Sequence, residues 1–152
     1  MAYTTAEARQ DLLDATAEAA NELGFAGACL AEAYEQLDEQ SGDRHEETCY
    51  RPVQMAYGRL KRTHTEFAGR HGLRAAAFES QAAGLPSQGA AGFVSRAVEA
   101  VAEADRILAE LQDSMLPVEA GDAELRAGLA SVREPLGELP TAAREFLRGL
   151  GR

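Results

Sequence analysis

The three histidines, His45, His64 and His71, are the side chains of this sequence best suited to metal or acid–base chemistry. His64 and His71 are seven residues apart, so on one helix they share a face at a separation of about 10 Å along the axis. That separation is too large for both rings to bind one metal ion. The sequence also lacks any Glu-x-x-His, the motif that di-iron bundles carry on two helices. We therefore expect no metal centre of this kind and no cofactor.

The candidate ligand-binding residues lie in the same stretch of chain and are Tyr57, Arg59, His64 and His71. Together they could bind a small polar molecule, or one histidine could bind a metal ion with carboxylates from the preceding helix. The structural alternative is that both histidines pack, partly exposed, beside an arginine-rich helix surface.

Arg59 and His64 enclose four residues, a spacing that resembles the Arg-x4-His element of HEPN ribonucleases, which are also small helical bundles. Leu60 stands where that family usually has a polar residue. The resemblance implies RNA cleavage that depends on Arg59 and His64. The net charge of −10 opposes it, because RNA binding requires a cationic surface.

The remaining motifs provide no catalytic set. The sequence contains no Gly-x-x-x-x-Gly-Lys-Ser/Thr loop, no Gly-x-Ser-x-Gly elbow and no Cys-x-x-Cys pair. Cys29 and Cys49 would be offset by about 9 Å in an antiparallel helix pair. A disulfide requires Cα atoms within about 7 Å, so we expect two buried free thiols. Tyr34 adjoins the apolar stripe of the first helix and is expected at the edge of the core.

The composition indicates an all-α protein. Of 152 residues, 31 are alanine and 17 are leucine, whereas valine and isoleucine together supply only seven. Sheets depend on β-branched and aromatic residues, so we expect one helical domain spanning residues 1–152. The net charge of −10 argues against nucleic-acid binding, and no segment approaches the ~18 apolar residues of a membrane span. Two cysteines and an N-terminus unlike a signal peptide indicate the cytoplasm.

Four apolar stripes, with members spaced alternately three and four residues apart, predict four helices at about 4–40, 44–83, 88–116 and 122–150. The stripes consist of Leu12, Thr16, Ala19, Leu23, Ala26, Leu30, Ala33 and Leu37; of Cys49, Val53, Ala56, Leu60, Thr63 or His64, and Phe67; of Val94, Ala97, Val101, Ala104, Leu108, Leu111 and Met115; and of Leu125, Leu129, Val132, Leu136, Leu139, Ala143, Phe146 and Leu150.

Two of these helices contain residues that disturb helical geometry. Pro52 and Gly72 permit breaks in the second helix, although its stripe can be continued through Phe78 to residue 83. Pro135 and Pro140 predict a fourth helix that is kinked or segmented. Amphipathic helices with short connections pack antiparallel, so we expect an antiparallel up-down-up-down four-helix bundle.

Opposite charges favour pairing of the first two helices. Residues 1–43 carry a net charge of −9, and residues 44–74 carry +4. If the turn centres on Gly42, facing residues have numbers that sum to about 84. The pairs that meet this condition are Asp14–Arg70, Glu22–Arg62 and Glu32–Arg51. We expect them to flank the seam between the two helices; the alternative is that the basic face binds an anionic partner.

The absence of a catalytic set, combined with strongly patterned helices, favours a non-enzymatic protein that associates with another protein or with itself. The first alternative is a helical bundle that binds a small molecule or a metal ion at the second helix. The second alternative is a ribonuclease of the HEPN type.

Overall fold

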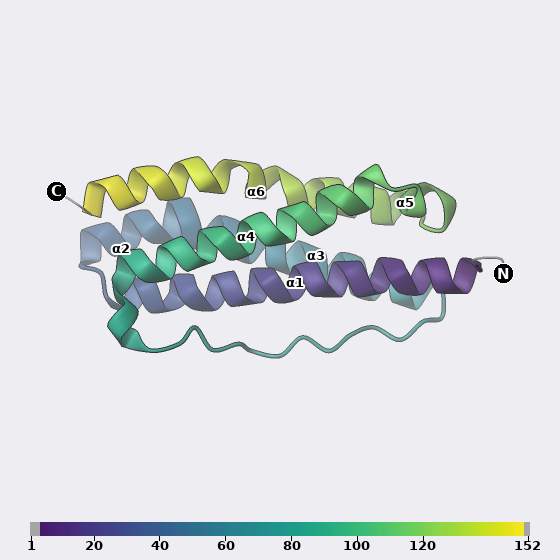
Figure 1. The fold of residues 1–152 in the computed structure, drawn as a ribbon, viewed down its shortest axis with the longest axis horizontal. Coiled ribbons are helices and arrows are strands. Elements are labelled where there is room, and N and C mark those ends of the chain that lie inside the picture. Colours follow the sequence, from purple (N-terminus) through teal and green to yellow (C-terminus); the bar gives the residue numbers. More distant parts are fainter. Residues whose placement is uncertain (1–3, 151–152) are drawn as a thin grey trace.

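The computed structural model describes residues 4–150, which contain helices and no strand. The prediction of an all-α fold is confirmed. Four long helices lie side by side (Figure 1): α1 Thr5–Glu35, α3 Arg51–Arg70, α4 Gly89–Asp113 and α6 Ala123–Leu150. The shorter elements are α2 Glu39–His45, the π-helix η1 Glu46–Tyr50, the 3-10 turn η2 Pro86–Gln88 and α5 Leu116–Glu119. No helix within residues 4–150 combines the length and apolar character that crossing a bilayer requires.

The first helix ends at Glu35, several residues before the predicted end at about 40. It ends there because Asp38 begins a new helix: its carboxylate accepts a hydrogen bond from the backbone N–H of Ser41 at 2.7 Å. Gly42, the expected turn residue, is instead buried inside α2. A Cβ atom on Gly42 would lie 3.2 Å from Cε2 of Tyr34, so the missing side chain lets the Tyr34 ring approach α2.

The elements α2, η1 and α3 form one helical path through Pro52. Proline has no N–H to donate and its ring crowds the carbonyl four residues earlier, so a regular α-helical turn cannot be completed there. The turn before Pro52 is widened into a π-helix, in which the N–H of Arg51 bonds to the carbonyl of Glu46. A π-turn takes up an additional residue and shifts the faces of the helix on either side. Pro52 therefore changes the register of the helix without ending it.

Helix α3 ends at Arg70, so the helical stretch predicted to reach residue 83 stops at Gly72, where a break was expected to be possible, and does not resume. Gly72 adopts a left-handed conformation with φ of 65°, and the N–H of Leu73 bonds back to the carbonyl of Ala68 at 2.8 Å. This arrangement is a Schellman cap, which ends a helix by turning the chain away. Residues 73–85, here called the strap, contain no helix or strand.

The strap runs back along the bundle from the end of α3 to the start of α4 (Figure 1). Side-chain amides fix its direction: Gln81 donates to the carbonyl of Asn21 at 2.7 Å, and Gln36 donates to the carbonyl of Pro86 at 3.0 Å. The strap is therefore parallel to α1, and α3 and α4 run in the same direction. The up-down-up-down order is not confirmed, because a connection spanning the whole bundle replaces the short turn expected there.

Each long helix has two long neighbours: α1 and α6 both pack against α3 and α4. The core is built from the predicted stripes, whose members are buried apart from Leu37, Thr63, Met115 and Leu150. Met115 is 58% exposed because α4 ends at Asp113, before the predicted residue 116. The last helix, α6, is one uninterrupted element that contains both internal prolines, so the predicted segmentation is not confirmed.

The charge pairs predicted between the first and second helices are absent from residues 4–150. Arg70 pairs with Asp122, at 2.8 Å, and not with Asp14. Glu22 faces Glu103 of α4, and burial followed by the repulsion of Glu103 raises the pKa of its carboxyl group. The prediction failed because the chain does not turn at Gly42, so the assumed register is wrong.

Cys29 and Cys49 are both buried and unpaired, which confirms the prediction of two free thiols. Burial is the main cause that raises the pKa of each thiol. Neither side chain therefore has the thiolate character that a nucleophile or metal ligand requires.

Candidate functional site

The four residues predicted to bind a ligand do not converge on one site. Tyr57 and His64 face α1 and the strap, where both line cavities. Arg59 instead donates to a backbone carbonyl of α6 at 3.2 Å. His71 bonds through Nε2 to Asp122, just before α6, at 2.9 Å. The set is therefore divided between two sides of α3.

His64 is almost completely buried, with 1% of its surface exposed, which corrects the expectation of a partly exposed ring. The N–H of Ala76 donates to its Nε2 at 2.9 Å, and its Nδ1 lies 2.8 Å from the hydroxyl oxygen of Thr16. Burial lowers the pKa of His64, so the ring is neutral. Both ring nitrogens are occupied within the protein, and the geometry lends no support to RNA cleavage by Arg59 and His64.

His45 is also buried and lies beside the π-helix. Its Nε2 donates to the carbonyl of Leu30 at 2.7 Å, whereas its Nδ1 has no hydrogen-bond partner among the described residues. Burial lowers the pKa of this histidine as well. Residues 4–150 contain no group of three or more histidine, cysteine, aspartate or glutamate side chains placed to hold a metal ion.

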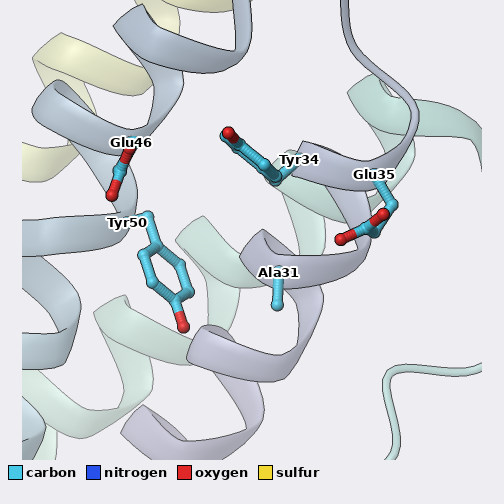
Figure 2. A pocket seen from close by; sticks show the side chains of 5 residues that line it. All are labelled: Ala31, Tyr34, Glu35, Glu46 and Tyr50. Atoms are coloured by element: carbon cyan, nitrogen blue, oxygen red, sulfur yellow. The ribbon is translucent and has the colours of Figure 1, made fainter.

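A cleft of about 260 Å³, which was not predicted from the sequence, lies where the end of α1 faces η1. Figure 2 shows Tyr34 reaching from α1 toward Glu46, with Tyr50 below Glu46 on the opposite wall. We call this site the tyrosine cleft. It is lined by Ala31, Tyr34, Glu35, Glu46 and Tyr50.

The tyrosine cleft carries negative charge that the protein does not neutralise. Neither Glu35 nor Glu46 takes part in an ion pair or a side-chain hydrogen bond with the described residues, and no basic residue lines the cleft. The hydroxyl groups of Tyr34 and Tyr50 are likewise without hydrogen bonds within residues 4–150. Tyr34 is 42% exposed, and its ring lies against the buried Gly42.

Local structure explains how these side chains come together. Tyr34 occupies the last turn of α1 and is held against α2 by the space that Gly42 leaves. Glu46 and Tyr50 are the first and last residues of the π-turn that precedes Pro52. π-Turns within helices are frequent at functional sites, because they redirect side chains that a regular helix would place elsewhere.

No protein-family model, curated protein or solved structure matches this chain. The chemistry of the cleft therefore has to indicate what it can bind. Two aromatic rings attract a cation to their faces, and two carboxylates provide acceptors for its N–H groups. Two features of the sequence could have indicated this cleft. One is the adjacent Tyr34-Glu35 near the end of the first apolar stripe, and the other is the presence of Glu46 and Tyr50 shortly before Pro52.

Proposed function

We propose that this protein acts by binding another protein, and that the tyrosine cleft receives a basic side chain of that partner. The observation that supports this proposal is the combination of two tyrosines with two unpaired glutamates around one small cleft. A basic side chain would supply the positive charge and the N–H donors that Glu35 and Glu46 lack.

Arginine fits this cleft better than lysine. Its guanidinium group is planar, so it can stack on the face of a tyrosine ring. Its N–H groups lie in that same plane and can then donate to carboxylates beside the ring. The cleft volume of about 260 Å³ is below the range of roughly 300–1,000 Å³ that is usual for pockets binding whole small molecules. That size favours a single side chain presented by a larger partner.

The overall charge supports a basic partner. The chain carries a net charge of −10, which attracts cationic surfaces over a distance of about one Debye length and speeds their encounter. The same charge repels a second copy of the chain. We therefore place a different, basic protein ahead of self-association, and we place the encounter in the cytoplasm, where free thiols such as Cys29 and Cys49 are usual.

A small organic cation, such as an amine, is the second candidate, because the same rings and carboxylates would recognise it. This keeps the hypothesis of small-molecule binding but moves it from Tyr57, Arg59, His64 and His71 to the tyrosine cleft. Metal binding at α3 and ribonuclease activity have no comparable support, since the side chains on which they depend are engaged elsewhere.

The proposal can be tested by titrating the isotope-labelled protein with N-acetyl-arginine amide and following backbone amide shifts by NMR. We expect shifts concentrated at residues 31–35 and 46–50, and at least a fivefold weaker affinity in a Glu35→Gln/Glu46→Gln variant. N-acetyl-citrulline amide, nearly the same shape without the charge, is the matched control and should cause no such shifts. Equal shifts with both compounds, or shifts elsewhere on the surface, would contradict the proposal.

Light scattering of the purified protein tests the choice of partner. We expect a monomer at low salt, because like charges oppose self-association. A dimer that dissociates on the Glu35→Gln/Glu46→Gln change would identify the partner as a second copy of the chain.

A further inference from the structure

The groove between α1 and α3 is filled along only part of its length. The strap enters it beside the start of α1, where Ala76 bonds to His64 and Phe78 packs edge-on against the same ring, with the ring centroids 5.3 Å apart. Gln81 then ties the strap to the carbonyl of Asn21 at 2.7 Å. In this part of the groove, an extended polypeptide lies between two helices.

Beyond Asn21 the strap leaves the groove and crosses to the other side of α1. The carbonyl of Ala83 accepts a hydrogen bond from Arg96 of α4 at 3.2 Å, and that of Pro86 accepts one from Gln36. The remainder of the α1–α3 groove, toward the end of α1, is left without a covering segment among the described residues.

A cavity of about 320 Å³ lies where the strap gives way to the uncovered part of the groove. Strap residues Phe78 to Gln81 line one end of it, and Ala31 and Tyr50, which also line the tyrosine cleft, line the other, so the cavity and the cleft are neighbours. Between these ends the cavity is lined by Gly24, Gly27, Gln54 and Tyr57.

Two glycines of α1 let side chains of α3 approach closely in this groove. A Cβ atom on Gly24 would lie 3.2 Å from the Tyr57 hydroxyl, and one on Gly27 would lie 3.0 Å from Nε2 of Gln54. Glycine costs about 1 kcal/mol in a helix compared with alanine. Both glycines face the groove, where their missing side chains let Tyr57 and Gln54 of α3 lie against the backbone of α1.

We propose that the uncovered groove binds an extended peptide segment of the partner, whose basic residue enters the tyrosine cleft. This inference rests on the proposed function and adds the shape of the ligand. From Gly24 to Tyr34 the α1 axis rises by about 15 Å, which an extended peptide covers with about four to five residues. The strap provides the precedent, since it lies in the same groove in extended form.

The charges of the groove set the polarity of the bound segment. Its cleft end carries Glu35 and Glu46 and no basic residue, whereas its other end carries one acid, Glu79, together with Lys61, whose ammonium group lies 4.1 Å from the centre of the Tyr57 ring. The excess of negative charge therefore lies at the Tyr34 end, which favours a basic residue there. Small residues are expected in the middle, beside Ala28 and Ala31.

Selection from a display library of random linear heptapeptides against the full chain tests this inference. We expect enriched peptides to share one arginine or lysine and to bind in a fluorescence anisotropy assay. Gly27→Leu, which fills the groove outside the cleft, should weaken their binding at least tenfold, as should Glu46→Gln. Gly137→Leu is the matched control, because nothing lies within 4 Å of a Cβ at that position, and it should bind as the wild type does.

The outcomes separate the two proposals. Loss of binding in Glu46→Gln with wild-type binding in Gly27→Leu would overturn the extended groove and leave the tyrosine cleft intact. A selection without enrichment, while N-acetyl-arginine amide still shifts residues 31–35 and 46–50, would overturn the groove in the same way. Peptides that bind equally to both variants would contradict both proposals. Circular dichroism of each variant confirms that a loss of binding does not reflect unfolding.

Discussion

The hydroxyl oxygen of Thr16 lies 2.8 Å from Nδ1 of His64 inside the core, and this contact joins α1 to α3. The position of the ring proton follows from the neighbours. The backbone N–H of Ala76 donates to Nε2, so Nδ1 carries the proton and donates to Thr16. The Thr16 hydroxyl hydrogen is then directed to the carbonyl of Leu12 or Leu13. One neutral histidine thus connects α1, α3 and the strap.

Stability is expected to fall in mild acid because of the buried histidines. Burial lowers the pKa of His64, and it also lowers the pKa of His45. The nearby Asp14 carboxylate raises the pKa of His64, but burial is the larger effect. The unfolded chain takes up protons near pH 6.5, so the stability that neutral rings provide is present above that pH and is lost as the pH falls below it. For each ring, the free energy of unfolding can fall by up to about 1.4 kcal/mol per pH unit in that window.

Urea unfolding at pH 7.5 and pH 5.5 measures this dependence. The wild type should lose stability between the two, and His64→Gln, which keeps a donor and an acceptor but does not titrate, should lose about half as much. A His45→Gln/His64→Gln variant whose loss equals that of the wild type would show that other groups cause it.

Gly128→Ala is expected to destabilise the protein although alanine favours helices. A methyl group there would overlap the side chain of Thr63 on α3, where the two helices are in contact. We expect a loss of about 1–3 kcal/mol, typical of overpacking. Gly137→Ala, in the same helix with open space around its Cβ, should instead stabilise by about 0.5–1 kcal/mol. Chemical denaturation of the two variants checks this contrast, which fails if their effects have the same sign.

Asp122 is expected to contribute more to the stability of the protein than a surface ion pair alone would. Its carboxylate accepts the N–H of Leu125 at 2.8 Å at the start of α6, and it also pairs with Arg70 at 2.8 Å. Bonding to Arg70 is the main cause that holds the pKa of Asp122 well below its usual range, so its contribution is lost as the pH falls below about 3.9. Asp122→Ala should cost about 1–2 kcal/mol at neutral pH, mostly from the lost cap.

Asp14→Ala is the control for Asp122→Ala, because Asp14 was predicted to pair with Arg70 and does not. A double-mutant cycle should give coupling of about 0.2–1 kcal/mol between Arg70 and Asp122 and none between Arg70 and Asp14. The reverse result would restore the register predicted from charge.

Leu108→Ala should cost about 2–5 kcal/mol, because Leu108 is fully buried in α4 and the change leaves a cavity. Arg106→Ala, two residues away, should cost less than about 1 kcal/mol, since its ion pairs with Glu103 and Glu110 are exposed. A denaturation experiment that gives similar losses for the two variants would place the buried face of α4 elsewhere.

The buried stripes could be predicted from the sequence because helical periodicity reports directly which residues face a core. Leu108 and Phe67 belong to stripes read from spacing alone, and both are fully buried. The direction of α4 could not be predicted in this way. Phe78 continued the stripe of the second helix by coincidence of spacing, and the left-handed Gly72 ends that helix before it.

The tyrosine cleft was missed for a different reason. Its opposing walls depend on a widened turn at Glu46–Tyr50 and on the close approach of Tyr34 to Gly42. A proline in a helical pattern indicates a disturbance but does not indicate how the backbone absorbs it. Which side chains meet across the cleft is a property of that local geometry together with the packing of α1 against η1.

The central claim is that a guanidinium group binds between the two tyrosines. Intermolecular nuclear Overhauser effects between N-acetyl-arginine amide and the labelled protein test it most directly. We predict cross-peaks from the δ-methylene protons of the ligand to the ring protons of both Tyr34 and Tyr50, lost in the Glu35→Gln/Glu46→Gln variant. Cross-peaks confined to the ring of Tyr57, or to neither tyrosine of the cleft, would contradict the account.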